Sequence, residues 1–389
     1  MSETVSPTLL PEGLRDVLPP DAAIEAALVE RLAASFEANG YDRVSPPLVE
    51  FENTLLAGMG AATADRIFRM VDPVSQRTLG LRADVTAQIA RIASTRLQTE
   101  QRPLRLMYAG QVMRVKGRQL RPERQFTQVG FELIGPDSVA ADLEAIVIAT
   151  EGLVSLGIAH ITVDMALPPL VPAILATQKF EASHLDDLLL ALDHKDVAEI
   201  RSLAGPLVDV LTALIEATGP IKNARERLAE IKLPSVAAAQ LETLFTVADQ
   251  VKDQSPDLSL TLDLVENRGL QYHTGVTFFL FAKGSLREIG RGGRYEIDHD
   301  EGRTEPATGA TLFMDGLLSV STKQELSVCV YIPFGTDRKT IVDLQAEGYR
   351  TKVSLSDGND IFKEAGRLGC SHVLAEGSVQ SVIKEGKAT

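Results

Sequence analysis

The feature that most constrains the fold is a series of β-type segments interrupted by a long helical stretch. From about residue 170 to 255 the sequence is rich in Leu and Ala, as in LDDLLLALDHK, and it has no alternating β-rich runs. Short runs of apolar, β-branched and aromatic residues, which are typical of strands, occur on both sides of this stretch. They are QRTLGLRA (76–83), LRLMYAGQVMRV (104–115), RQFTQVGFELIG (124–135), HITVDMA (160–166), LSLTLDLV (258–265) and YHTGVTFFLFA (272–282). The pattern predicts a β-containing domain that carries a helical insertion at about 170–255.

Two helices are predicted before the insertion. The first begins at Asp21, a candidate N-cap, and ends at Gly40, because apolar residues recur at every fourth position between them. The second runs from about Val139 to Leu156, after the candidate cap Ser138 and before a glycine.

The C-terminal part of the chain has a different texture. After Thr322 the sequence alternates in the order strand, helix, strand, helix, strand, from SVCVYIPF (327–334) to SHVLAEG (371–377). This alternation is typical of a small α/β domain. We therefore predict two domains, residues 1–322 and residues 323–389.

The composition excludes several classes of function. The 53 acidic residues outnumber the 39 Lys and Arg residues, for a net charge of −14, which disfavours broad nonspecific binding to nucleic acid or to an anionic membrane. Cys329 and Cys370 form no CxxC or Cys/His pattern, so neither a metal site nor a disulfide framework is predicted. The sequence has no export signal and no uncharged apolar stretch of about 18 residues, so we expect a cytoplasmic protein without a membrane span.

The stretch RVKGRQLRPERQFTQ (114–128) concentrates positive charge in this acidic chain. A solvated loop between two strands is the simplest interpretation for a cationic stretch of this kind. However, Phe126, Gln128 and Glu132 share one face of the strand that follows, because side chains alternate along a strand. Buried polar side chains need partners, so this face is expected to contact a ligand.

Two further segments contain candidate ligand-binding groups. In LRADVT, Asp84 and Thr86 lie on one face if the segment is extended, where they could accept a ligand's ammonium group, although a capping role for Asp84 is favoured in isolation. In ENRGLQYHTG, Arg268, Tyr272 and His273 lie in a predicted turn between apolar strands, and no nearby Ser or Cys provides a nucleophile for the histidine.

The glycine cluster GRGGRYE lacks the GxGxxG spacing of dinucleotide-binding loops. We interpret Gly290, Gly292 and Gly293 as a tight turn between strands. Arg294 and Tyr295, which follow them, can both contact a small polar ligand.

Taken in order, these segments resemble the class II aminoacyl-tRNA synthetases of the histidyl type. The resemblance covers most of residues 10 to 320 apart from the insertion, and includes PEGLRDVLPPDA (11–22), VSPPLVEFENT (44–54) and GATLFMDGLLSV (309–320) together with the segments above. It implies an α+β fold with a six- or seven-stranded antiparallel sheet and flanking helices, and a homodimer formed through the motif around Pro47.

The residues that such synthetases use for ATP are replaced here. Lys116 stands where the family has a glutamate that reads the adenine amine, and a cation cannot accept that hydrogen bond. Asp315 and Gly316 stand where the family has a Glu-Arg pair whose arginine stacks on adenine. This pattern is similar to that of the ATP phosphoribosyltransferase regulatory subunit family.

This second resemblance implies a non-catalytic subunit that is required for the first step of histidine biosynthesis. Its partner would be a short-form ATP phosphoribosyltransferase catalytic subunit in a hetero-octamer, and L-histidine would be the feedback effector. No catalytic residue, cofactor or metal is implied. The residues that match the family's histidine-binding positions are Asp84, Thr86, Arg114, Gln128, Glu132, Arg268, Leu270, Tyr272 and His273, with Asp84 in place of a glutamate and His273 in place of a tyrosine.

Two other functions remain as alternatives. An active histidyl-tRNA synthetase would need the ATP contacts that Lys116 and Gly316 remove. A tRNA-sensing module is disfavoured by the C-terminal unit, which balances acids and bases and is short for an anticodon-binding domain. We therefore do not expect tRNA as a partner.

Overall fold

The computed structural model divides the chain into two compact units, Met1–Thr322 and Lys323–Thr389. The structure describes residues 9–56, 64–117, 121–266, 272–299, 302–321, 327–358 and 360–382. Within these ranges no helix is both long enough and apolar enough to cross a membrane.

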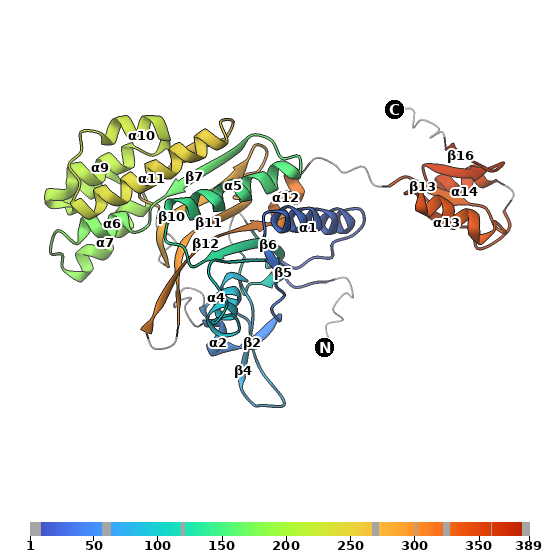
Figure 1. The fold of residues 1–389 in the computed structure, drawn as a ribbon, viewed down its shortest axis with the longest axis horizontal. Coiled ribbons are helices and arrows are strands. Elements are labelled where there is room, and N and C mark those ends of the chain that lie inside the picture. The colour runs from blue at the N-terminus through green and yellow to red at the C-terminus, as the bar shows by residue number, and fades with distance from the viewer. Residues whose placement is uncertain are drawn as a thin grey trace, which may run out of the picture. The chain divides into compact units, whose positions relative to one another are not determined.

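A mixed sheet forms the centre of the first unit (Figure 1). Among the described residues it has nine strands, and the second to the seventh in the order below are antiparallel to one another, as the resemblance implies. The order is β1 (Asp42–Arg43), β5 (Leu104–Met113), β6 (Gln125–Ile134), β12 (Thr304–Phe313), β11 (Gly290–Asp298), β10 (His273–Ala282), β7 (Ile161–Ala166), β9 (Ser259–Leu262) and β8 (Gly219–Pro220).

The two faces of this sheet belong to different cores. Val129 and Phe131 of β6 pack in the larger core with α1 (Asp21–Ala38), α5 (Val139–Ser155) and α11 (Ser235–Gln254), and Phe36 of α1 meets Phe131 edge to face. Phe126 and Ile134, on the opposite face of the same strand, pack in a second core with Ile89 of α4 (Thr86–Thr95). Because side chains alternate along β6, its residues pack in turn against the helical layer on one face and against the α4 side on the other.

The two predicted helices are present, with one correction at a cap. α5 begins after Ser138, whose side chain accepts a hydrogen bond from the backbone N–H of Ala141, as predicted. In α1, Pro20 occupies the N-cap position, so the prediction that Asp21 is the cap is wrong. Asp21 lies in the first turn instead, where a carboxylate still interacts favourably with the helix dipole.

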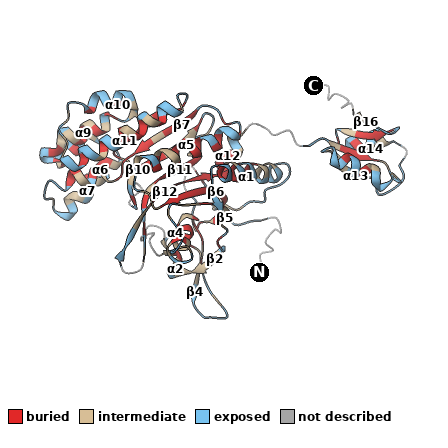
Figure 2. Ribbon diagram, in the orientation of Figure 1, coloured by how far each residue is buried: buried red, intermediate tan, exposed pale blue. Residues whose placement is uncertain are grey.

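The residues predicted as an insertion form a helical layer between β7 and β9. Its helices bury one face each and expose the other (Figure 2). Because β9 returns to pair in parallel with β7, the insertion leaves the sheet and rejoins it at a neighbouring position. The elements are α6 (Leu170–Leu175), α7 (Ala182–Asp193), α8 (Val197–Leu203), a short 3-10 helix (Gly205–Leu207), α9 (Val208–Glu216), α10 (Ile221–Leu228) and α11.

Smaller elements complete the first unit. A three-stranded sheet has the order β2 (Val49–Phe51), β4 (Thr78–Leu81), β3 (Arg69–Val71) and lies next to α2 (Glu52–Leu56). The helix α12 (Met314–Val320) follows β12 directly.

The second unit has the predicted alternation and one additional strand. Its sheet has the order β14 (Arg350–Val353), β13 (Cys329–Ile332), β15 (His372–Ala375), β16 (Ser378–Ser381), with α13 (Arg338–Ala346) and α14 (Ile361–Arg367) between strands. The first three strands are parallel, whereas β16, which the sequence did not predict, is antiparallel to β15. The Sγ atoms of Cys329 and Cys370 lie 3.2 Å apart as free thiols.

Candidate ligand-binding site

A pocket opens over the middle of the large sheet, on the face that carries α4. Three paired strands form its floor, where Glu132 of β6 is opposite Gly309 of β12, and Gly309 is opposite Gly293 of β11. The pocket has about 340 Å³ of empty space, counted with its opening to solvent. Its lining residues are Asp84, Thr86, Glu132, Tyr272, His273, Arg291, Gly292, Gly293, Tyr295, Gly309, Ala310 and Thr311.

The glycines of the floor make space where neighbouring groups approach closely. A Cβ atom on Gly309 would clash with Oε2 of Glu132 and with the backbone oxygen of Phe131. A Cβ atom on Gly292 would likewise clash with the backbone oxygen of Gly309. The predicted tight turn at 290–293 is therefore wrong: these glycines lie inside β11, and glycine is needed there for the close approach of strand and side chain rather than for a bend.

Glu132 is the most deeply buried acid in the pocket, with 2% of its surface exposed. The Tyr295 hydroxyl donates a hydrogen bond to its Oε2 at 3.0 Å. Burial raises the pKa of Glu132 to about 8; Thr86, Tyr295 and Tyr108 oppose this through hydrogen bonds, and Asp84 adds to it through its charge. At neutral pH, Glu132 is therefore mainly a neutral carboxylic acid.

Asp84 is held at the mouth of the pocket by two neighbours. Gln128, which is fully buried, donates from Nε2 to Oδ2 of Asp84 at 3.0 Å and accepts from the backbone N–H of Val85 with its own Oε1. The backbone N–H of Thr86 donates to Oδ1 of Asp84 at 3.0 Å, at the start of α4. Val85 occupies the N-cap position of α4, so the capping role favoured for Asp84 in isolation is wrong; its carboxylate contacts the backbone of Thr86 and lines the pocket.

A chain of hydroxyl groups connects the two sides of the pocket. The Tyr108 hydroxyl lies 3.2 Å from Oγ1 of Thr86 and 2.7 Å from Oγ1 of Thr311. Burial raises the pKa of Tyr108 well above its ordinary value, so the phenol stays protonated. The sequence did not single out Tyr108 or Thr311, because in each case the polar contact comes from a distant strand.

Some of the predicted site residues line the pocket, and others do not. Asp84, Thr86, Glu132, Tyr272 and His273 line the pocket, and Gln128 positions Asp84. Arg114 is buried beside the pocket, where its Nε donates to the backbone oxygen of Ala83 at 3.3 Å and its guanidinium lies over the ring of Phe126. Arg268 and Leu270 lie outside the described residues.

Arg294 does not take the ligand-facing position that the sequence suggested. Its guanidinium pairs with Asp142 of α5 at 2.8 Å and also contacts Asp137. It is therefore held on the helix-covered side of β11, opposite to the face on which Tyr295 contacts Glu132.

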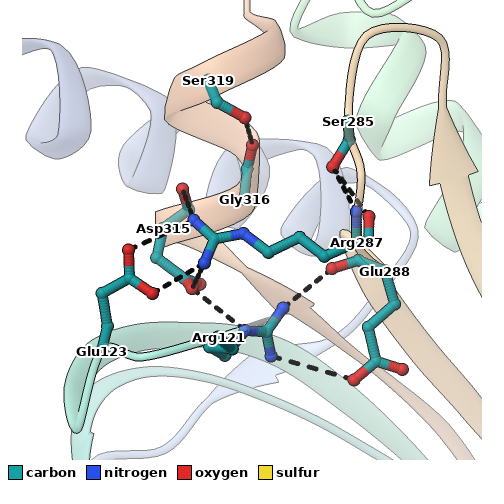
Figure 3. Close-up of polar contacts among 8 residues, drawn as sticks. All are labelled: Arg121, Glu123, Ser285, Arg287, Glu288, Asp315, Gly316 and Ser319. Atoms are coloured by element: carbon teal, nitrogen blue, oxygen red, sulfur yellow. Dashed lines mark hydrogen bonds and ion pairs between the residues drawn. The ribbon is translucent and has the colours of Figure 1, made fainter. Parts of the chain in front are cut away.

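A second polar cluster connects the cationic stretch to α12 (Figure 3). Nε of Arg121 lies 3.0 Å from Oδ2 of Asp315, and its Nη2 donates to the backbone oxygen of Glu288 at 2.8 Å. Arg287 pairs with Glu123 at 2.7 Å and with Asp315 at 3.4 Å.

This cluster shows that Arg121 does not lie in a solvated loop, which was the simplest interpretation of the cationic stretch. Arg121 has 5% of its surface exposed, and its guanidinium lies 4.0 Å from the ring centre of Phe313. Its partners come from segments far away in the sequence, so the sequence could not indicate them. Arg118, the other loop arginine, lies outside the described residues.

Comparisons with known proteins agree on the family. The histidyl-tRNA synthetase family model matches residues 13–317. The chain is 47% identical to the ATP phosphoribosyltransferase regulatory subunit of Paramagnetospirillum magneticum over 98% of this chain and 100% of that protein, and 46% identical to that of Rhodospirillum rubrum over 96% and 97%. A crystal structure of an ATP phosphoribosyltransferase regulatory subunit/histidyl-tRNA synthetase from Bacillus halodurans has the same fold, with a TM-score of 0.77 and 23% identity over 92% of this chain and 96% of that one.

The antiparallel sheet, the pocket at its centre and the similarity along nearly the whole chain lead to one assignment. The chain belongs to the ATP phosphoribosyltransferase regulatory subunit family, whose members share the histidyl-tRNA synthetase-like domain.

Proposed function

We propose that this chain is the non-catalytic regulatory subunit of an ATP phosphoribosyltransferase and binds L-histidine in the pocket over its central sheet. It is required for the first step of histidine biosynthesis, and it transmits feedback inhibition by histidine to a short-form catalytic subunit. Binding can regulate the partner because histidine favours one arrangement of the complex over another.

The observation that carries this proposal is that two acidic side chains, Asp84 and the buried Glu132, line the same pocket. Asp84 is positioned by Gln128 to accept from the ammonium group of an amino acid. Glu132, which shares a hydrogen bond with Tyr295, faces the same space from the sheet and can exchange a proton with an imidazole ring, because its pKa of about 8 lies close to neutrality.

The absence of synthetase activity is supported by the side chains at the positions expected for ATP. Lys116 is exposed at the surface, and Gly316 supplies no side chain. The guanidinium of Arg121 lies over the rings of Phe313 and Phe126, and its charge is already paired with Asp315. The rings of Phe313 and Phe126 and the charge of Arg121 are thus engaged with each other and with Asp315 inside the protein, and we propose that they do not bind ATP.

The proposed assembly is a hetero-octamer with the catalytic subunit, built on a homodimer of this chain in the cytoplasm. The net charge of −14 supports an assembly that does not include tRNA. Each of the two domains, residues 1–322 and 323–389, is proposed to fold around its own core, which the separate apolar clusters support.

The decisive experiment combines the purified chain with a short-form ATP phosphoribosyltransferase. We expect activity to appear when the chain is added and to fall when L-histidine is added, and native mass spectrometry to give a mixed octamer. Glu132→Ala should weaken inhibition while activation persists, whereas Arg225→Gln, at an exposed ion pair of the insertion, should leave both unchanged.

Two results would contradict the proposal. One is histidine-dependent ATP–pyrophosphate exchange by the chain alone, which would favour an active synthetase. The other is inhibition by histidine of the same strength with the Glu132→Ala variant, which would place the effector site elsewhere.

A further inference from the structure

We propose that Arg291 binds the carboxylate of the pocket's ligand and thereby makes the site selective for a free amino acid over the corresponding amine or alcohol. The inference rests on the proposed function, since it takes L-histidine as the ligand.

Arg291 lies in the floor of the pocket by virtue of its position on β11. Its Cα partner on β12 is Thr311, and two residues further along the strand Gly293 is opposite Gly309. Thr311, Gly293 and Gly309 all line the pocket. Side chains two apart on a strand share a face, so Arg291 is on the same side as Gly293 and Tyr295, the face that carries Glu132.

Arg291 is the arginine among the described residues that line the pocket. Among the described residues its guanidinium forms no ion pair with a carboxylate at 4.0 Å or less, and it lies 5.9 Å from the ring centre of Phe313. Other arginines near the sheet are engaged: Arg121 pairs with Asp315, and Arg294 with Asp142. A partly buried guanidinium has five N–H donors to satisfy, and a carboxylate matches two of them at once.

Arg291 and Asp84 provide one cation and one acidic side chain in the same pocket, which are the two groups that a zwitterion needs. Both line the pocket, yet within the described ranges they form no ion pair at 4.0 Å or less. They still interact through space, because Asp84, after Glu288 and Tyr272, is among the groups that raise the pKa of Arg291 against the opposing effect of burial. An α-amino acid carries its ammonium and carboxylate on one carbon, so it can bridge an acid and a base that are near each other but not in contact.

The alternative anchor among the described residues is Arg114. Its Nε donates to the backbone oxygen of Ala83, its guanidinium stacks on Phe126, and it does not line the pocket. Arg291 is therefore better placed to reach a ligand over the glycine floor.

The test is a ligand series measured by isothermal titration calorimetry on the full chain. L-histidine is compared with L-histidinol and histamine, which keep the imidazole and the amino group but lack the carboxylate. We expect the wild type to bind L-histidine about 10- to 100-fold more tightly than either, as is typical when a charge-assisted bidentate contact is lost.

Arg291→Gln should remove this preference. Its affinity for L-histidine should fall about 10- to 100-fold, while its affinity for histamine should stay the same or rise, because a cation that repels the ligand's ammonium is gone. Arg291→Lys keeps the charge without the planar fork and should give an intermediate loss. Arg225→Gln provides an arginine control outside the pocket, and thermal melting checks that each variant is folded.

The outcomes separate this inference from the proposed function. If the wild type does not bind L-histidine, the proposed function fails and this inference falls with it. If the wild type binds L-histidine but binds histamine equally well, or if Arg291→Gln weakens both ligands to the same degree, only the assignment of the carboxylate to Arg291 is overturned. If Arg291→Gln does not fold, Arg291→Lys supplies the same comparison, and an undiminished preference for L-histidine in that variant would overturn the assignment.

Discussion

The hydroxyl of Tyr295 donates a hydrogen bond to Oε2 of Glu132 at 3.0 Å, from one strand to a carboxyl group on another with β12 between them. Both side chains are buried, and Gly309 on β12 between them has no side chain to block the contact. The pair is therefore possible because three strands from separate parts of the sequence lie next to one another in this order.

The burial of Glu132 predicts how the stability of the protein depends on pH. Its pKa is raised from 4.5 to about 8 in the folded state, so the folded protein holds the proton more tightly than the unfolded chain. This contribution to stability is fully present below about pH 4.5 and is lost as the pH rises through about 8. Glu132→Gln cannot titrate, so we expect its melting temperature to change less than that of the wild type between pH 5 and pH 8. Equal slopes in thermal melts of the two proteins would contradict this assignment.

Gly309→Ala should eliminate ligand binding and destabilise the fold. The added Cβ would clash with Oε2 of Glu132 and with backbone oxygen of Phe131, and the paired strands cannot move apart without losing hydrogen bonds. We expect a loss of about 1 to 3 kcal/mol in the free energy of unfolding, measured by urea denaturation. Gly316→Ala is the matched control, because its Cβ would meet Ile289 and Glu288 at ordinary distances of 3.4 and 3.5 Å and alanine favours a helix. If both variants behaved alike, close packing over the pocket floor would not be the cause.

Arg121→Gln should be far more destabilising than the loss of a surface arginine. The change leaves the buried carboxylate of Asp315 with the more distant Arg287 as its cation. Breaking a buried ion pair by removal of one partner costs about 3 kcal/mol or more, whereas an exposed pair contributes less than about 1 kcal/mol. Arg225→Gln, which removes the exposed pair with Asp249, is the comparison. Similar unfolding free energies for the two variants would argue against a structural role of the Arg121 cluster.

The two thiols of the second unit are expected to form a disulfide under mild oxidation. Their Sγ atoms are 3.2 Å apart, so closure needs little movement of β13, which begins at Cys329, or of the segment before β15, which contains Cys370. Burial, followed by interactions with Cys329, raises the pKa of Cys370 to about 11, so the reaction should become faster as the pH increases from 7. Incubation with oxidised glutathione, which is reduced as the thiols lose two hydrogen atoms, should be followed by mass spectrometry. Cys329→Ser should give no intramolecular bond; persistence of two free thiols in the wild type after long oxidation would refute the prediction.

Much of the fold was predictable because its signals are local. The periodic apolar residues of α1, the cap at Ser138 before α5 and the alternation in the second unit each depend on residues close together in the sequence. The same holds for Glu132 and Asp84, which stood out because a polar residue on a strand face or at a helix start needs a partner. The errors arose where local chemistry allowed two outcomes. The glycines at 290–293 favour a turn by composition, but in β11 they provide space for the neighbouring strands.

The sequence by itself determined the place of the insertion, most of the strands and helices around it and several of the polar residues that line the pocket, since all of these follow from spacing along the chain. The tertiary structure decided which charges meet. It paired Arg121 with Asp315 and Arg294 with Asp142, and it placed Arg291 in the pocket without an ion pair at 4.0 Å or less among the described residues. Such pairings join segments far apart in the sequence, and their strength depends on burial and on distances of a few ångströms that only the packed sheet and helices set.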